Sequence, residues 1–137
     1  MRRRAVSAVA PARDVAKRFY AAIDVDDVET ILALCAEDVV VRYPAAGRLP
    51  YGGEWSGHDG LGAFLDAHEA AEEILEFAPT SMLVEGDTVV VLGAFRGRAR
   101  ATDRTWTTDF VHVLTITDGR IRRWTSSFDT AAALDAR

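Results

Sequence analysis

The amino-acid sequence predicts a single α+β domain in which helices lie over one face of a curved, mostly antiparallel sheet. Two observations lead to this class. Apolar residues recur mainly at helical spacing between residues 12 and 77, and they alternate with polar residues between 80 and 128. Helices therefore precede most of the strands, an order typical of α+β proteins. The 137 residues are enough for one domain with one core.

Two amphipathic helices open the predicted domain. Residues 12–23 and residues 28–37 each place their apolar side chains on one stripe. Asp26 or Asp27 stands where the N-cap of the second helix is expected. A third helix is predicted over residues 58–77, with these residues on one face: Leu61, Phe64, Leu65 and His68.

A strand and a long loop separate the second helix from the third. Residues 39–43 form a β-branched run that Pro44 stops, which predicts a first strand. Residues 44–57 include two prolines and four glycines, so no regular element fits them. Tyr51 and Trp55 are large aromatic residues in this loop, which indicates that the loop folds over something apolar.

Four strands follow the third helix in two hairpins. Residues 80–84 and 88–98 are separated by Glu-Gly-Asp, a hairpin signal. The second hairpin begins at Trp106, and its strands meet at a turn over residues 117–119, where Asp-Gly favours the positive φ angles of a tight turn.

The loop length of the second hairpin decides which side chains share a face. A three-residue loop pairs His112 with Trp124 and Phe110 with Ser126, so that all four face the same side. A two-residue loop pairs His112 with Thr125 and turns Trp124 to the other face. We favour the three-residue loop, because it gathers the large aromatic residues around a single polar group, His112.

Composition and charge exclude several kinds of function. A net charge of -5 argues against binding to nucleic acid or to an anionic membrane surface. The single cysteine, Cys35, excludes an internal disulfide and a thiolate metal cluster. No run approaches the roughly 18 apolar residues of a membrane span. We expect a cytoplasmic protein whose residues 1–11 form a disordered leader ahead of the domain, residues 12–137.

The order of elements and three motifs resemble the nuclear transport factor 2-like superfamily, and within it the SnoaL-like proteins. The motifs are RFYAAIDVDDVETILALCAEDVVVRYP, YGGEWSGHDGLGAFL and HVLTITDGRIRRWTSSFDTAA. The resemblance implies a cone-shaped fold, in which three N-terminal helices close over the concave face of the sheet around a deep apolar pocket. It also implies a homodimer packed through the sheets.

The resemblance implies a catalytic residue only where this sequence matches the catalytic pattern of a related enzyme. The ketosteroid-isomerase pattern places its tyrosine at Phe19, its carboxylate base at Tyr43 and its neutral acid near Val111 or His112, so none of its catalytic groups is kept. The aspartate of the epoxide-hydrolase pattern falls at Ser126. The acid/base aspartate of SnoaL-type cyclases falls at His112, and histidine also transfers protons near neutral pH.

The candidate catalytic residues are therefore His112, with Tyr43 and Tyr51 as donors to an enolate oxygen. The other reading of His112 is a core histidine bonded to a neighbouring group, and that of the tyrosines is a ring with its hydroxyl at the surface. The expected substrate-binding residues are Phe19, Tyr20, Trp55, Phe64, His68, Trp106, Phe110, Trp124, Ser126 and Phe128.

Two classes of function fit these residues. The first is a cofactor-independent lyase, isomerase or cyclase that acts on a small hydrophobic carbonyl compound, polyketide-like or polycyclic. The second is a non-catalytic protein that binds such a molecule or a partner. A metal site is not expected, because the three histidines are far apart in sequence and have no carboxylate at ligand spacing. A partly apolar stripe of Thr107, Val111, Val113, Thr125 and Ile121 predicts a homodimer through the outer sheet face.

Overall fold

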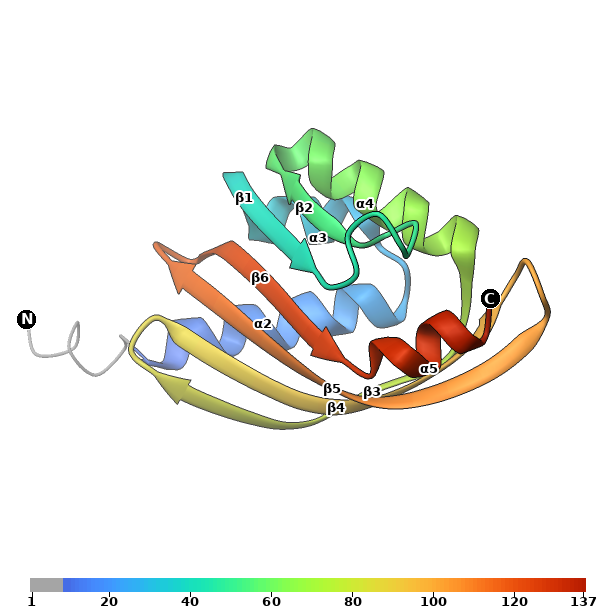
Figure 1. Ribbon diagram of the computed structural model, residues 1–137. Helices are drawn as coiled ribbons and strands as arrows, with labels where there is room; N and C mark the ends of the chain where they lie inside the picture. The colour runs from blue at the N-terminus through green and yellow to red at the C-terminus, as the bar shows by residue number, and fades with distance from the viewer. Residues whose placement is uncertain (1–8) are drawn as a thin grey trace, which may run out of the picture.

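The computed structural model describes residues 9–137 and confirms the α+β class (Figure 1). The predicted leader falls mainly on residues 1–8, which lie outside the described residues, and the first described helix begins at Val9 rather than at residue 12. The elements, in chain order, are α2 (Val9–Asp24), α3 (Val28–Leu34), β1 (Cys35–Tyr43), β2 (Gly53–Ser56), α4 (Gly57–Ala71), β3 (Glu72–Glu85), β4 (Thr88–Ala99), β5 (Arg104–Thr117), β6 (Arg120–Phe128) and α5 (Thr130–Asp135).

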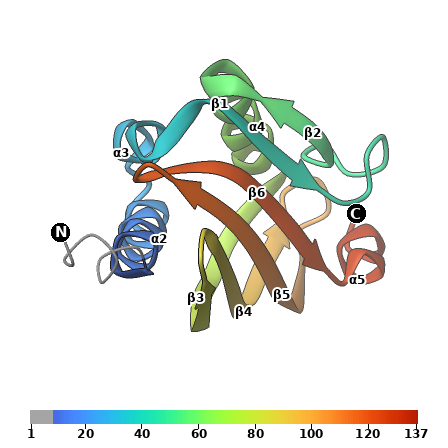
Figure 2. The same cartoon turned by 90° about the vertical axis from the view of Figure 1, so that its left-hand side faces the viewer.

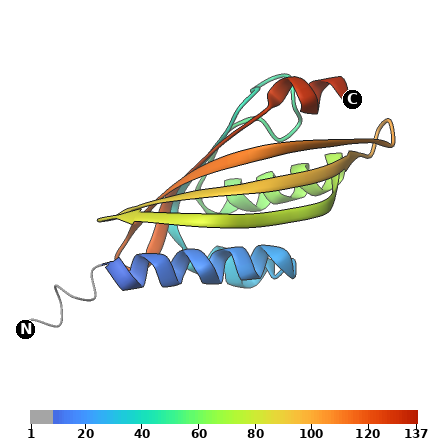
Figure 3. The same ribbon diagram turned by 90° about the horizontal axis from the view of Figure 1, so that it is seen from below.

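The six strands form one curved sheet in the order β2-β1-β6-β5-β4-β3. All neighbouring pairs are antiparallel except β1 and β6, which are parallel. Figure 2 shows the sheet curling from β3 round to β2, with α4 inside the curve. Figure 3 shows α2 running alongside β3. The helices α2, α3 and α4 thus close over the concave face, and α5, at the C-terminal end, is the fourth helix of residues 9–137.

The core lies where the amphipathic helices meet the inward face of the sheet. Phe19 of α2, Val39 of β1 and Leu114 of β5 are fully buried there. The predicted cap of the second helix is confirmed at Asp27, whose carboxylate accepts from the Thr30 backbone N–H at 3.2 Å. The Asp129 carboxylate caps α5 in the same way. These caps fix where α3 and α5 begin.

The hairpin of β5 and β6 has a register that neither predicted loop describes. Asp118 and Gly119 both have positive φ, as a two-residue type I′ turn requires, and Thr117 pairs with Arg120. A β-bulge next to Thr115 then shifts the ladder by one residue, so His112 pairs with Ser126 rather than with Trp124 or Thr125. Relative to the favoured three-residue loop, the turn and the bulge together shift the register by two residues, which leaves every side chain on the same face. The prediction that the large aromatic residues share a face with His112 is therefore confirmed, although the predicted loop length is wrong.

Three predicted element boundaries are wrong. The predicted third helix ends at Ala71, and the next residues belong to β3, where they pair with β4 along its whole length. Cys35 begins β1 instead of continuing the second helix. Residues 53–56, predicted as loop, form β2 because their backbone groups pair with the edge of β1. In all three places pairing with a neighbouring strand overrides the local pattern.

The outer face of the sheet is partly apolar. Val111 and Val113 of β5 are each 38% exposed, and Leu92 of β4 is 37% exposed beside them. Ile121, which we assigned to the same stripe, is fully buried, because the bulge turns it to the inner face. Among residues 9–137, no helix is both long and apolar enough to cross a membrane.

Two strands with different lengths form the edges of the sheet. β2 has only 4 residues, whereas β3 has 14. The pairing of β3 with β4 is irregular between Ile74 and Glu76 and again between Pro79 and Ser81.

Candidate active site

A cavity of about 110 Å³ lies between the helices and the concave face of the sheet. On this scale a single water needs about 10–15 Å³, so the cavity has room for a small organic molecule. Its walls come from α2, α4, the loop after β1 and the inward residues of β3, β4, β5 and β6. Three exposed residues, Asp26, Glu69 and Ile74, mark its rim.

His112 lies on the cavity wall and is 1% exposed. Its Nδ1 is 2.7 Å from the hydroxyl oxygen of Tyr20 on α2, and among the described residues this is the only hydrogen bond of the His112 side chain. The ring is packed among aromatic rings, with the Phe110 centroid at 4.5 Å and the Trp124 centroid at 5.5 Å. Burial lowers the pKa of His112 to about 3, so the ring is neutral at pH 7.

Two polar atoms next to His112 have no hydrogen-bond partner within residues 9–137. These are the indole Nε1 of Trp124 and the hydroxyl Oγ of Ser126, both on the cavity wall and both in residues that are at most 4% exposed. Ser126 is the cross-strand neighbour of His112. A buried polar atom without a partner costs stability, so two of them in one wall indicate a place for polar atoms of a ligand.

Tyr43, the last residue of β1, lies between the two ends of the cavity. Its ring centroid is 6.3 Å from that of His112 and 6.1 Å from that of Tyr51. Burial raises the pKa of Tyr43, and the Ser126 hydroxyl, which lies near that of Tyr43 without meeting the geometry of a hydrogen bond, acts in the opposite direction. The Tyr43 hydroxyl therefore keeps its proton and can act as a hydrogen-bond donor.

A buried carboxylate, that of Glu72, lies behind the cavity wall, where Tyr51 and Trp106 bond it. Its Oε2 accepts from the Tyr51 hydroxyl at 3.1 Å and its Oε1 from the Trp106 indole N–H at 2.9 Å. Burial raises the pKa of Glu72, against the opposing effect of these two hydrogen bonds. Burial also raises the pKa of Tyr51, and the neighbouring Glu72 adds to that shift.

The sequence does not single out Glu72, because the helical pattern of residues 58–77 runs through it. Residues 73–77 show no period of two that would mark a strand, and Ile74 and Phe77 both line the cavity because the pairing with β4 is irregular between them.

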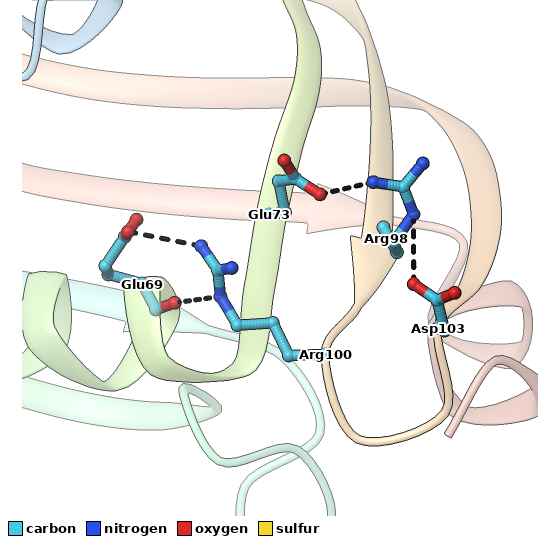
Figure 4. A network of polar contacts seen from close by, with 5 residues as sticks. All are labelled: Glu69, Glu73, Arg98, Arg100 and Asp103. Atoms are coloured by element: carbon cyan, nitrogen blue, oxygen red, sulfur yellow. Dashed lines mark hydrogen bonds and ion pairs between the residues drawn. The ribbon is translucent and has the colours of Figure 1, made fainter.

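Surface ion pairs hold the backbone on both sides of Glu72 (Figure 4). Glu69 at the end of α4 accepts from Arg100, through its backbone carbonyl at 2.8 Å and its carboxylate at 3.2 Å. Glu73 pairs with Arg98, which also contacts Asp103 at 3.3 Å. Because successive strand residues point to opposite faces, the outward pairing of Glu73 leaves Glu72 directed into the protein.

His68, one of the expected substrate-binding residues, lies on the cavity wall next to Tyr51. Its ring is 4.5 Å from the ring of Tyr51, centroid to centroid, and burial lowers its pKa to about 4. The described part of the chain contains no group of three or more histidine, cysteine, aspartate or glutamate residues that could hold a metal ion.

Most of the residues predicted for the site do line this cavity. They are Tyr43, Tyr51, Phe64, His68, Trp106, Phe110, His112, Trp124, Ser126 and Phe128.

Three predicted substrate-binding residues do not reach the cavity. Phe19 is fully buried in the core with its ring against that of Trp124. Tyr20 lies behind His112 and positions it. Trp55 packs against Phe64, with its indole N–H donating to the Tyr51 carbonyl at 3.2 Å. These three side chains support the wall from outside it.

Comparisons with known proteins agree with this architecture. A family model described as a SnoaL-like domain matches residues 16–124. An NTF2-like protein from Burkholderia xenovorans LB400 is 30% identical over 93% of this chain and 96% of its own, with a TM-score of 0.84. TerC, solved after co-crystallisation with polyporic acid, is 31% identical over 92% of this chain and 97% of its own, also with a TM-score of 0.84. No curated protein matches the chain in sequence.

Proposed function

Because the chain belongs to the SnoaL-like family, we propose that it is a cofactor-independent enzyme that transfers protons on a small hydrophobic carbonyl compound. The reaction would be of lyase, isomerase or cyclase type. The observation that carries this proposal is the neutral His112, held by Tyr20 on the wall of an aromatic cavity beside unpartnered polar atoms of Trp124 and Ser126. TerC supports the ligand class, because its structure was solved after co-crystallisation with polyporic acid.

In the proposed reaction His112 is the base. The tautomer with its proton on Nδ1 donates to the Tyr20 oxygen and leaves the Nε2 lone pair free to accept a proton from carbon. A negative charge that develops on the ligand beside the ring favours the imidazolium, which offsets the lowered pKa of the empty site. Tyr43 donates to the enolate oxygen, and Trp124 and Ser126 hold polar atoms of the ligand.

A second candidate function is binding without catalysis. A histidine whose pKa burial lowers to about 3 is a weak base at neutral pH, and this favours a pocket that holds its ligand only by contacts and hydrogen bonds.

Exchange of the carbon-bound protons of β-tetralone, a bicyclic ketone, in deuterated water separates the two functions. An enzyme should speed the loss of the α-proton NMR signal above the buffer rate. His112→Ala and His112→Asn should both lower that rate by roughly 10²–10⁴, while the affinity for polyporic acid stays similar. The asparagine amide still offers a side-chain partner to Tyr20, so the second variant tests the base without the loss of that contact.

His58→Gln is the matched control, because His58 bonds the Cys35 carbonyl at 2.9 Å and does not line the cavity. It should exchange β-tetralone as the wild type does. A wild-type exchange rate equal to that of buffer, with polyporic acid still bound, would contradict the enzyme function and favour binding without catalysis.

We also propose that the protein is a homodimer through the outer sheet face, with exposed Leu92, Val111 and Val113 at its centre. Light scattering at micromolar concentration should give twice the mass of one chain. Val113→Asp should give monomers, because it buries a charge without a partner in the interface. A monomeric wild type at that concentration would contradict this assembly.

A further inference from the structure

Glu72 is a buried acid that the proposed reaction of His112 does not use. It is the first residue of β3, follows α4 directly and is 1% exposed. Its carboxylate makes none of the salt bridges found among residues 9–137, although Arg100 and Arg137 are near enough to act on it through their charge. A buried carboxylate without a salt bridge is costly when ionised, so its place here needs a reason.

Its two hydrogen bonds lead to the cavity. The Tyr51 ring comes from the loop between β1 and β2 and the Trp106 ring from β5, and both rings line the cavity while their polar ends meet at Glu72. The Glu72 carboxylate therefore does not contact a ligand in the cavity directly, and it can act on such a ligand only through the Tyr51 hydroxyl. Tyr43 lies between Tyr51 and His112, so a ligand placed over its ring can contact both.

We propose that Glu72, acting through Tyr51, is a positioning and proton-supplying residue that provides the acid partner of His112. This inference rests on the proposed proton-transfer function. In the structure the Tyr51 O–H donates to Glu72 Oε2. Burial favours the protonated form of Glu72; in that form its O–H donates to the Tyr51 oxygen, which frees the Tyr51 O–H to donate to a carbonyl oxygen of the ligand.

The proton balance of the step closes without a further reactant. As His112 Nε2 takes the proton from carbon, the carbonyl oxygen takes the Tyr51 proton and Tyr51 takes that of Glu72. The products are an enol, an imidazolium and a Glu72 carboxylate. When His112 returns its proton to a second carbon, the enol proton passes back through Tyr51 to Glu72, so the isomerised ketone leaves with no net gain or loss of protons.

The charged and titratable groups around Glu72 predict the pH dependence. Tyr51 comes from the loop after β1, His68 from α4, Arg100 from the turn between β4 and β5, and Arg137 from the C-terminal end. Burial raises the pKa of Glu72, whereas its two hydrogen bonds and the two arginines lower it. Because the step needs protonated Glu72, the exchange rate should fall as the pH rises through the pKa of this group.

Glu72→Gln tests the inference, because glutamine keeps the size of the side chain and accepts hydrogen bonds but supplies no proton. We expect it to slow β-tetralone exchange roughly 10²-fold, with unchanged affinity for polyporic acid, and to remove the basic limb of the pH profile. Tyr51→Phe should slow exchange by the same factor, and the double variant should be no slower than either single variant, because the two residues act as one unit. Glu76→Gln, the same change at an exposed residue of β3 that does not line the cavity, should exchange as the wild type does.

The outcomes separate this inference from the proposed function. An inactive wild type would overturn both. An active wild type that needs His112 but is matched by Glu72→Gln in rate and pH profile would overturn only the role of Glu72. A loss of polyporic acid affinity and urea stability in proportion to the lost rate would also overturn it, because Glu72 would then only hold the wall in place. If Glu72→Gln does not fold, Tyr51→Phe decides by the same rate and affinity.

Discussion

The hydrogen bond between Tyr20 and His112 should contribute measurably to the free energy of unfolding. It is 2.7 Å long, and its two residues are 5% and 1% exposed, so water cannot replace either partner. Tyr20→Phe removes the hydroxyl that Nδ1 bonds and leaves Nδ1 of a buried imidazole unsatisfied, which costs about 1–3 kcal/mol. With a urea m-value of about 2 kcal/mol/M for a chain of this size, the midpoint of unfolding should fall by about 1 M.

A double-mutant cycle separates the hydrogen bond from the lost packing. His112→Leu removes both ring nitrogens, and in that background Tyr20→Phe no longer strands a polar atom on the histidine. The two substitutions should therefore be non-additive by about 1–2 kcal/mol in urea unfolding followed by circular dichroism. A single-variant loss below about 0.5 kcal/mol, or additive losses, would refute the view that this bond is buried and satisfied only by its partner.

Three other predictions concern stability. Burial lowers the pKa values of His112 and His68 to about 3 and about 4, so the unfolded state binds more protons than the folded state below about pH 6.5. The free energy of unfolding should therefore fall toward pH 4, by up to about 1.4 kcal/mol per pH unit for each histidine. Urea unfolding of His112→Asn should show a smaller slope in that window, and an equal slope would contradict the lowered pKa. Gly93→Ala would place a Cβ 2.3 Å from the Phe110 ring and should cost about 1–3 kcal/mol in thermal unfolding. A Cβ at Gly62 would have no atom within 4 Å, so Gly62→Ala should not destabilise the protein. Equal melting temperatures of the two variants would argue against close packing at Gly93. Asp129→Ala removes the cap of α5 and should cost about 0.5–2 kcal/mol by the same measurement, and an unchanged melt would show that α5 does not need its cap.

The sequence pattern predicts the class of the fold and one wall of the site. The alternation around His112 identifies the inward face of β5, because a half-buried strand repeats every two residues. The aromatic loop residue Tyr51 is recognisable because large rings in a loop need a surface to cover. These residues depend on local periodicity, which the sequence contains.

The rest of the site depends on contacts between distant segments. Glu72 is buried because α4 ends at Ala71 and β3 pairs with β4, and neither event has a local signal strong enough to stop the helical pattern. Tyr20 supports His112 from 92 positions away, a contact that only the packing of α2 against the sheet creates. The bulge next to Thr115 likewise depends on how two strands fit their neighbours.

The irregular edge strand β3 has a consequence for how copies of this chain can associate. An exposed strand of 14 residues offers unpaired backbone groups on which a second strand could add and start a growing ribbon. On this edge Pro79 has no backbone N–H to donate. The irregularities beside Glu76 and Pro79 divide the other backbone donors of β3 into short runs. Glu76 and Glu85 are exposed on the same strand. The opposite edge is only 4 residues long. We therefore expect strand addition and fibre formation to be disfavoured at both ends of the sheet, so that the protein remains dispersed even at the high concentrations used for ligand titrations.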